Sequence, residues 1–241
     1  MTGCGLLIDT SIYGAAVGIL AAGSRDPDYI EVTENFADSA RQLPEMVERG
    51  FKSIGAQLGD ISEMVVSRGP GSFTGIRVGL AYALGLRLGL SRGIGGTRFA
   101  GISSLSLLAI SEAKKRSCSV ALFLPSTKTS GYLALSDGLE TKLLPVNLSI
   151  EPSLESHVSS ELRWQNCHQI SIGSWDFLSS SAFIKSRGGL EIYDPRLVAE
   201  RMIIEMALAS RQWPGSAWDN AVTDPIYLRK SSVEEKAMLG V

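Results

Sequence analysis

Histidine and cysteine are scarce in this chain of 241 residues, which holds only two histidines and three cysteines. His157 and His168 cannot supply a three-histidine zinc site, and neither stands in an HExxH spacing. Cys4, Cys118 and Cys167 lie far apart and form no CxxC pair, which argues against a disulfide framework or a thiolate zinc site. The sequence therefore predicts no metal site.

A basic excess and a membrane-spanning run are also missing. The chain holds 23 Lys and Arg against 25 Asp and Glu, a formal net charge of −2, so no bulk basic field attracts it to nucleic acid. No uncharged run of about 18 apolar residues occurs. The apolar start of the chain lacks a basic region and contains Asp9, which does not fit a signal peptide. With 44% hydrophobic residues, we expect a folded protein, and the lack of a disulfide pattern favours the reducing cytoplasm.

Hydrophobic periodicity predicts an α/β fold of two lobes, residues 1–115 and residues 116–241. In the first lobe, short apolar runs bounded by turn formers predict strands, and longer periodic segments predict helices. Strands are expected at 5–11, 15–20, 29–34, 63–67 and 95–99, and helices at 39–58, 76–90 and 103–115. Leu43, Val47 and Leu58 share one face of the first of these helices.

In the second lobe, the sequence predicts strands and helices clearly near both ends, whereas hydrophobic periodicity is weak in the middle. Strands are expected at 119–124, 131–136 and 168–173, and a helix at 195–211. Asp194 followed by Pro195 is typical of an N-cap and a first helical position. Residues 137–160 are serine-rich, and we expect extended structure and loops there. The pattern leaves open that the C-terminal tail packs back on the first lobe.

A glycine-rich loop, Arg68-Gly-Pro-Gly-Ser-Phe-Thr-Gly75, separates a predicted strand from a predicted helix. Backbone amides and the positive end of a helix can form an anion site at such a place. However, the loop lacks the Gly-Lys-Ser/Thr ending of a P-loop, and Thr74 stands where GxGxxG has its third glycine. A vestigial nucleotide site would use Gly69, Gly71 and Ser72. A loop whose glycines supply unusual dihedrals is the favoured interpretation.

Small residues recur along the helix predicted after this loop. Five of them fall within about 160° of one another at the helical spacing, namely Gly75, Gly79, Ala83, Gly85 and Gly89. Each glycine inside a helix costs about 1 kcal/mol relative to alanine. Several of them imply a compensating gain, and close backbone approach by another element supplies it. That element belongs either to the same chain or to a partner subunit, and the sequence leaves both open.

The run from Ser67 to Gly79, together with 81–90, resembles the signature of the TsaB family, also called YeaZ. Shorter stretches match in the right order: Ile8–Ser11, Leu43-Pro44, Gly101–Leu105 and Pro225–Arg229. The resemblance covers the first 110 residues and the tail, and it is poor from about Cys118 to Asp194.

This resemblance implies a two-lobed actin-like ATPase fold, which is ribonuclease H-like with mixed sheets flanked by helices, and a protein that makes no product by itself. Family members pair with the catalytic subunit TsaD, which transfers a threonylcarbamoyl group to the adenosine beside the anticodon of tRNA. An ATPase, TsaE, joins the pair, tRNA is contacted only indirectly, and a homodimer is also compatible. The expected partner interface comprises Phe73, Gly75, Ile76, Gly79, Tyr82, Ala83, Leu86, Leu43 and Val47.

The sequence departs from the family pattern at two places. Asp38 stands where the family commonly has a histidine, and Pro125-Ser126-Thr127 replaces the Asp-Ala-Arg turn of the second lobe. The missing carboxylate would face a bound nucleotide in active members of the superfamily, so ATP binding is disfavoured and no cofactor is expected. Asp9 then remains the only obvious carboxylate of the vestigial site, and it equally fits a turn-forming role.

Two other functions stay open. The first is an enzyme of the same superfold, an ATP-binding small-molecule kinase or ATPase, which requires Asp9, the glycine loop and a carboxylate of the second lobe. The second is an inert homodimer whose partner role has decayed. A peptidase is rejected because the sequence offers no metal ligands.

Overall fold

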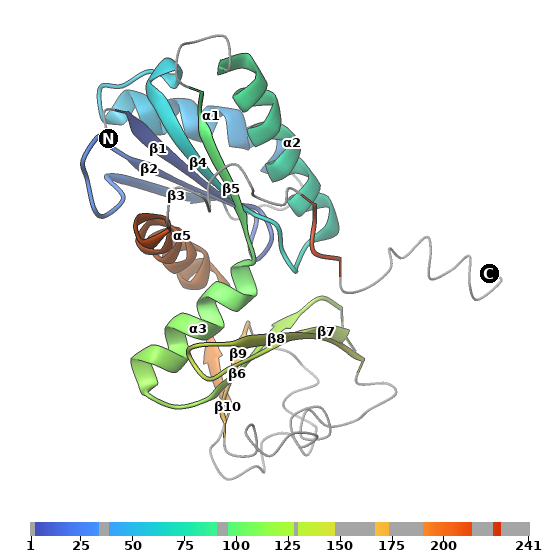
Figure 1. The fold of residues 1–241 in the computed structure, drawn as a ribbon. Coiled ribbons are helices and arrows are strands. Elements are labelled where there is room, and N and C mark those ends of the chain that lie inside the picture. Colours follow the sequence, from blue (N-terminus) through green and yellow to red (C-terminus); the bar gives the residue numbers. More distant parts are fainter. Residues whose placement is uncertain are drawn as a thin grey trace, which may run out of the picture. The chain divides into compact units, whose positions relative to one another are not determined.

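The computed structural model describes residues 3–33, 39–90, 96–127, 130–147, 167–173, 190–213 and 224–227. The chain divides into two units, Met1–Leu107 with Asp194–Pro225, and Leu108–Tyr193 with Ile226–Val241. Each unit is built on a five-stranded mixed sheet, so the predicted two-lobed α/β class is confirmed (Figure 1). Predictions at Asp38, at His157 and at the last two residues of Pro225–Arg229 lie outside the described residues.

The first sheet has the strand order β3-β2-β1-β4-β5. Its strands are β1 (Cys4–Asp9), β2 (Ala15–Leu20), β3 (Tyr29–Thr33), β4 (Ile61–Ser67) and β5 (Arg98–Ile102). β1 pairs antiparallel with β2 and parallel with β4. Every residue of β1 and β2 is buried, because helices cover both faces of the sheet at these strands. These two strands therefore read as continuous apolar runs instead of alternating ones.

Helices α1 (Ser39–Ser53) and α2 (Phe73–Leu90) cover one face of this sheet (Figure 1). α1 ends before the predicted end at residue 58, because Gly55 adopts a left-handed φ of 71°. The amide of Ala56 donates to the carbonyl of Phe51 and closes the last turn. Leu58 therefore lies outside α1, in the short 3-10 helix η2 (Leu58–Asp60).

The opposite face of the first sheet is covered by α5 (Pro195–Gln212) (Figure 1). This helix belongs to the first unit, so its predicted place in the second lobe was wrong. Met202, Ile203 and Met206 are fully buried against the sheet. A Cβ at Gly18 in β2 would lie 2.1 Å from Cγ2 of Ile203, so the glycine is what lets α5 approach this closely.

The start of α5 follows the predicted capping pattern. Oδ1 of Asp194 accepts hydrogen bonds from the amides of Arg196 at 2.8 Å and Leu197 at 3.4 Å, and Pro195 is the first helical residue. We expect Asp194→Ala to lower the free energy of unfolding by about 1 kcal/mol, measured by urea denaturation. Asp194→Asn is the control and should keep most of the stability. Equal stability of the alanine variant and the wild type would contradict the capping role.

The second sheet has the order β10-β9-β6-β7-β8. Its strands are β6 (Val120–Pro125), β7 (Ser130–Ser136), β8 (Thr141–Asn147), β9 (His168–Ile172) and β10 (Leu190–Tyr193). Both sheets have three successive antiparallel strands followed by two parallel ones, so the second unit repeats the strand plan of the first. β8 falls in the segment for which only extended structure and loops were predicted, and β10 was not predicted.

Helix α3 (Ser104–Arg116) carries the chain from one unit to the other. The division lies between Leu107 and Leu108, inside this helix, and not after residue 115. An amphipathic pattern marks the helix but does not reveal which of its turns belongs to which core, which explains the difference. Within the described residues, no helix is both long enough and apolar enough to cross a bilayer.

Candidate functional site

The glycine-rich loop between β4 and α2 lies directly against the turn that follows β1. The amide of Ser72 donates to the carbonyl of Ser11 at 2.8 Å, and Oγ1 of Thr10 donates to the carbonyl of Gly75 at 2.7 Å. A Cβ at Gly71 would lie 2.1 Å from the Ser11 carbonyl oxygen, and one at Gly75 would lie 1.9 Å from that of Thr10. We call this backbone contact between residues 10–11 and 71–75 the clasp.

Three backbone amides of this loop, those of Gly69, Ser72 and Gly75, already have acceptors within the chain. Ser72 Oγ accepts from the amide of Gly75 at 3.1 Å and caps α2, while the amide of Ser72 itself is used in the clasp. The amide of Gly69 donates to Oγ of Ser67 at 3.3 Å. Anion binding at a helix N-terminus depends on unpaired amides. The clasp thus engages the predicted site residue Ser72 and packs Gly71 against Ser11, while the amide of Gly69, the third predicted site residue, is bound by Ser67.

Asp9, at the end of β1, is completely buried beneath the clasp. Its Oδ1 accepts from the amide of Ser11 at 3.1 Å and from Ser11 Oγ at 2.6 Å. The same Ser11 hydroxyl contacts Oγ of Ser67 at 2.9 Å and Oγ of Ser104 at 2.8 Å. Among the described residues, Oδ2 of Asp9 has no hydrogen-bond partner. Burial raises the pKa of Asp9, although the hydrogen bonds from the hydroxyl and the amide of Ser11 act in the opposite direction.

In the second unit, hydrogen bonds join Ser126 and Thr127 to Ser130, close to where the family pattern has a carboxylate. The amides of Ser126 and Thr127 both donate to the carbonyl of Ser130, at 2.9 and 3.0 Å. Oγ1 of Thr127 lies 2.5 Å from Oγ of Ser130. The described residues Pro125–Thr127 therefore supply hydroxyls and a proline at this turn, and no carboxylate.

Most of the predicted partner interface is buried inside the first unit and needs correction. Six of its nine residues have almost no exposed surface: Leu43, Val47, Gly75, Ile76, Gly79 and Ala83. A Cβ at Gly79 would lie 2.3 Å from Oγ1 of Thr10, so this glycine, like Gly75, lets α2 pack closely against Thr10. The compensating gain for these two helix glycines comes from the chain's own packing. Large substitutions there test folding instead of pairing.

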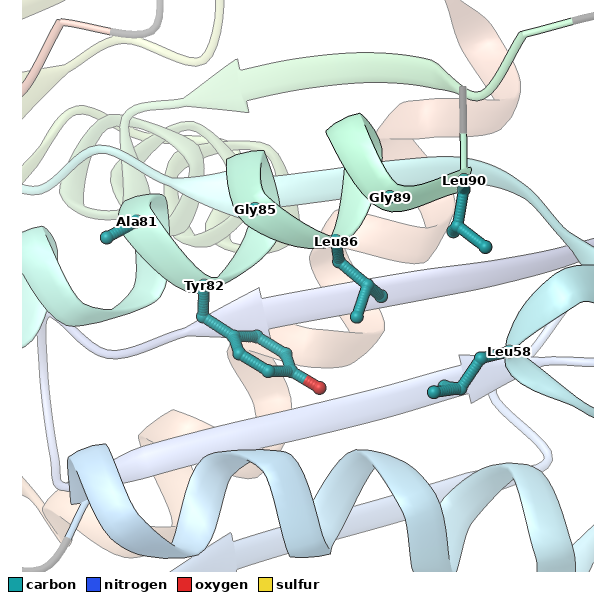
Figure 2. Close-up of a pocket in the computed structure, with 7 residues that line it drawn as sticks. All are labelled: Leu58, Ala81, Tyr82, Gly85, Leu86, Gly89 and Leu90. Atoms are coloured by element: carbon teal, nitrogen blue, oxygen red, sulfur yellow. The ribbon is translucent and has the colours of Figure 1, made fainter. Parts of the chain in front are cut away.

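The other two helix glycines face outward. Gly85 and Gly89 are exposed, and a Cβ added to either would meet no atom of the chain within 4 Å. They line an apolar groove of 410 Å³, together with Leu58, Ala81, Tyr82, Leu86 and Leu90. Figure 2 shows Tyr82 and Leu86 extending from the same side of α2, with Leu58 of η2 nearby.

The groove follows the spacing of an α-helix surface. Ala81, Gly85 and Gly89 recur every four residues, and their small side chains leave a shallow groove along the helix. Tyr82, Leu86 and Leu90 form a parallel row of large side chains beside it. Rows of this spacing are the ridges and grooves through which helices pack on one another. The repeat of small residues at positions 81, 85 and 89 is visible in the sequence. The predicted set of small residues instead grouped Gly85 and Gly89 with Gly75, Gly79 and Ala83, which face the core.

Phe73, the remaining predicted interface residue, is partly buried at the start of α2. The guanidinium carbon of Arg77 lies 3.9 Å from the centroid of its ring, so the ring has a cation–π neighbour within the chain. Of the predicted interface set, only Tyr82 and Leu86 line the groove.

Comparison with known proteins gives matches to proteins named for one tRNA modification. The model of the TsaD family, described as tRNA N6-adenosine threonylcarbamoyltransferase, matches residues 35–140. The tRNA threonylcarbamoyladenosine biosynthesis protein TsaB of Haemophilus influenzae is 34% identical over 84 residues, 35% of this chain and 34% of that protein. TsaB of Escherichia coli is 36% identical over 84 residues, 35% of each chain. The match thus spans about a third of the length of these relatives.

Similarity of fold extends over nearly the whole chain. A Pseudomonas aeruginosa structure described as similar to peptidase YeaZ superposes with a TM-score of 0.66, covering 94% of this chain and 100% of the other, at 20% identity. A structure described as YeaZ of the same organism gives 0.62 at 18% identity, with the same coverage. The two mixed sheets with flanking helices have the two-lobed actin-like fold expected from the resemblance.

Proposed function

We propose that this chain is a member of the TsaB (YeaZ) family and acts as a non-catalytic subunit in tRNA threonylcarbamoyladenosine biosynthesis, a proposal supported by its similarity to two TsaB proteins and to the TsaD family model. Its partner would be a TsaD-type catalytic subunit, with a TsaE-type ATPase joining the pair. The chain would hold the catalytic subunit in its working form in the cytoplasm. With a formal net charge of −2, it would leave most contact with tRNA phosphates to that partner.

The observation that carries this proposal is the apolar groove on α2. Gly85 and Gly89 each cost the helix about 1 kcal/mol, and no described residue of the chain approaches them. Leu88, beside the groove, leaves 74% of its surface exposed. A helix from another subunit would recover this cost, because its side chains could enter the row 81–85–89 and contact Tyr82 and Leu86. We therefore propose the groove as the partner-binding surface.

A non-catalytic role is supported by the clasp and by the second-lobe turn. The amides of Ser72 and Gly69 already donate hydrogen bonds within the chain. Asp9 is completely buried, and Pro125–Thr127 contains no carboxylate. The rival function, an ATP-binding kinase or ATPase, would need these groups to be accessible. Calorimetric titration of the chain with magnesium–ATP separates the two: micromolar binding with turnover would favour the rival.

The groove predicts a specific loss of pairing in Gly85→Leu. A leucine here has space in the isolated chain but fills the row that a partner helix would enter. We expect the affinity for a TsaD-type subunit to fall at least tenfold, about 1.4 kcal/mol, in a calorimetric titration. The thermal unfolding midpoint of the isolated chain should not fall.

Thr74→Leu is the matched control, since Thr74 is exposed on α2 but does not line the groove. It should pair like the wild type. If a second copy of the chain occupies the groove instead, sedimentation will show a wild-type dimer that Gly85→Leu converts to monomer. Pairing of Gly85→Leu at wild-type affinity would remove the groove from the interface.

A further inference from the structure

Asp9 sits at the centre of a buried hydroxyl network that the proposed partner function does not use. We propose that Asp9 is held as a neutral carboxylic acid at neutral pH, and that its ionisation at alkaline pH opens the clasp. The device would make the start of α2 sensitive to pH through one carboxyl group.

The surroundings of Asp9 favour the neutral acid. The residue has no exposed surface, and Oδ2 has no hydrogen-bond partner among the described residues. An ionised oxygen left unpaired in a dry interior is far more costly than a neutral one. Ser11 Oγ donates to Oδ1 at 2.6 Å, a hydrogen bond that either form of the carboxyl can accept.

No charged neighbour offsets this cost within the described part of the chain. The groups that act on the Asp9 carboxyl are the hydroxyls of Ser11 and Ser67 and the amides of Ser11 and Ile12, all of them neutral. β2 pairs with Asp9 through Ala16, and α3 contributes the hydroxyl of Ser104 to the network. Each of these neighbours presents an uncharged group to Asp9, and burial raises the pKa of Asp9.

Ser11 couples the carboxyl to the clasp. Its amide and hydroxyl both donate to Asp9, while its carbonyl accepts from the amide of Ser72 and touches Gly71. An ionised Oδ2 requires water or another donor. A Cβ added at Gly71 would lie only 2.1 Å from the Ser11 carbonyl oxygen, so the two segments are already in close contact, and water would reach the carboxylate by separating them. Ionisation and opening of the clasp are therefore one event.

The sign of the pH dependence follows from proton linkage. Asp9 binds its proton more tightly in the folded chain than in the unfolded chain, where the pKa is about 4. Its contribution to stability is complete below that pH and is lost as pH rises toward the folded-state pKa. In this window the folding equilibrium constant falls by up to tenfold for each pH unit.

Infrared difference spectroscopy of wild type against Asp9→Asn tests the protonation state directly. We expect a protonated carboxylic acid band in the wild type at pH 7 that is missing in Asp9→Asn and disappears at alkaline pH. Glu63→Gln is the control: it removes another buried carboxyl of the same sheet, one paired with Arg98 at 2.5 Å, and should leave that band unchanged. A carboxylate band for Asp9 at pH 7 would overturn the proposal.

Hydrogen exchange of the wild type tests opening without any substitution. The Ser72 amide belongs to the clasp, and the Val65 amide lies in β4 of the same unit. We expect the exchange rate of Ser72 relative to Val65, each corrected for its intrinsic rate, to rise at least tenfold between neutral and alkaline pH. A constant ratio across this range would show that Asp9 does not control the clasp.

Discussion

Gly75→Ala is expected to destabilise the chain by about 3 kcal/mol or more, although alanine is the better helix former. The added Cβ would lie 1.9 Å from the carbonyl oxygen of Thr10, and a backbone atom cannot rotate away as a side chain can. The turn after β1 or the start of α2 must shift, and the hydrogen bond from Thr10 Oγ1 to the Gly75 carbonyl is lost with it.

Gly85→Ala makes the same chemical change on the same helix and is the matched control. Its Cβ meets no atom of the chain within 4 Å, so only helix propensity acts, and we expect a stabilisation of about 0.5–1 kcal/mol. Urea unfolding of both variants measures the contrast. Equal stability of the two would mean that α2 does not pack on Thr10 as described, and that Gly75 belongs with the outward glycines.

Arg116→Met is expected to lower the free energy of unfolding of the second unit by about 3 kcal/mol. Glu112 is 1% exposed and accepts hydrogen bonds from Arg116 Nε at 2.8 Å and from Tyr193 OH at 3.0 Å. Removing the guanidinium takes a positive charge and a hydrogen-bond donor away from this buried carboxylate. The hydrogen bond to Glu112 also raises the pKa of Arg116, as expected for a pair stabilised in its charged form.

Urea unfolding followed by probes in each unit measures this effect. Arg49→Met is the control: Arg49 pairs with Glu31 at 2.6 Å but is half exposed, so we expect a loss below about 1 kcal/mol. Adding Glu112→Gln to Arg116→Met removes the negative charge at position 112 and should recover part of the lost stability. If the double variant is no more stable than Arg116→Met alone, the negative charge of Glu112 is not the source of the loss.

Local signals in the sequence identified most elements of the first unit. Capping by Asp194 and the glycine loop before α2 act within a few residues, so a reader of the sequence can recognise them. The predicted end of the first helix was wrong because a single left-handed residue, Gly55, outweighs apolar periodicity that continues to Leu58. β10 gave no signal, since a strand of four residues is too short to show a period.

The sequence by itself determined the α/β class, the two lobes, the family resemblance and the presence of a helix with too many glycines. Only the tertiary structure decided what those glycines do. Gly75 and Gly79 pack against Thr10, whereas Gly85 and Gly89 border an open groove. The physical reason is that helical spacing reports which residues share a face, while the neighbour of that face is set by contacts between segments distant in sequence. The same holds for Asp9, whose neighbours Ser67 and Ser104 come from other elements.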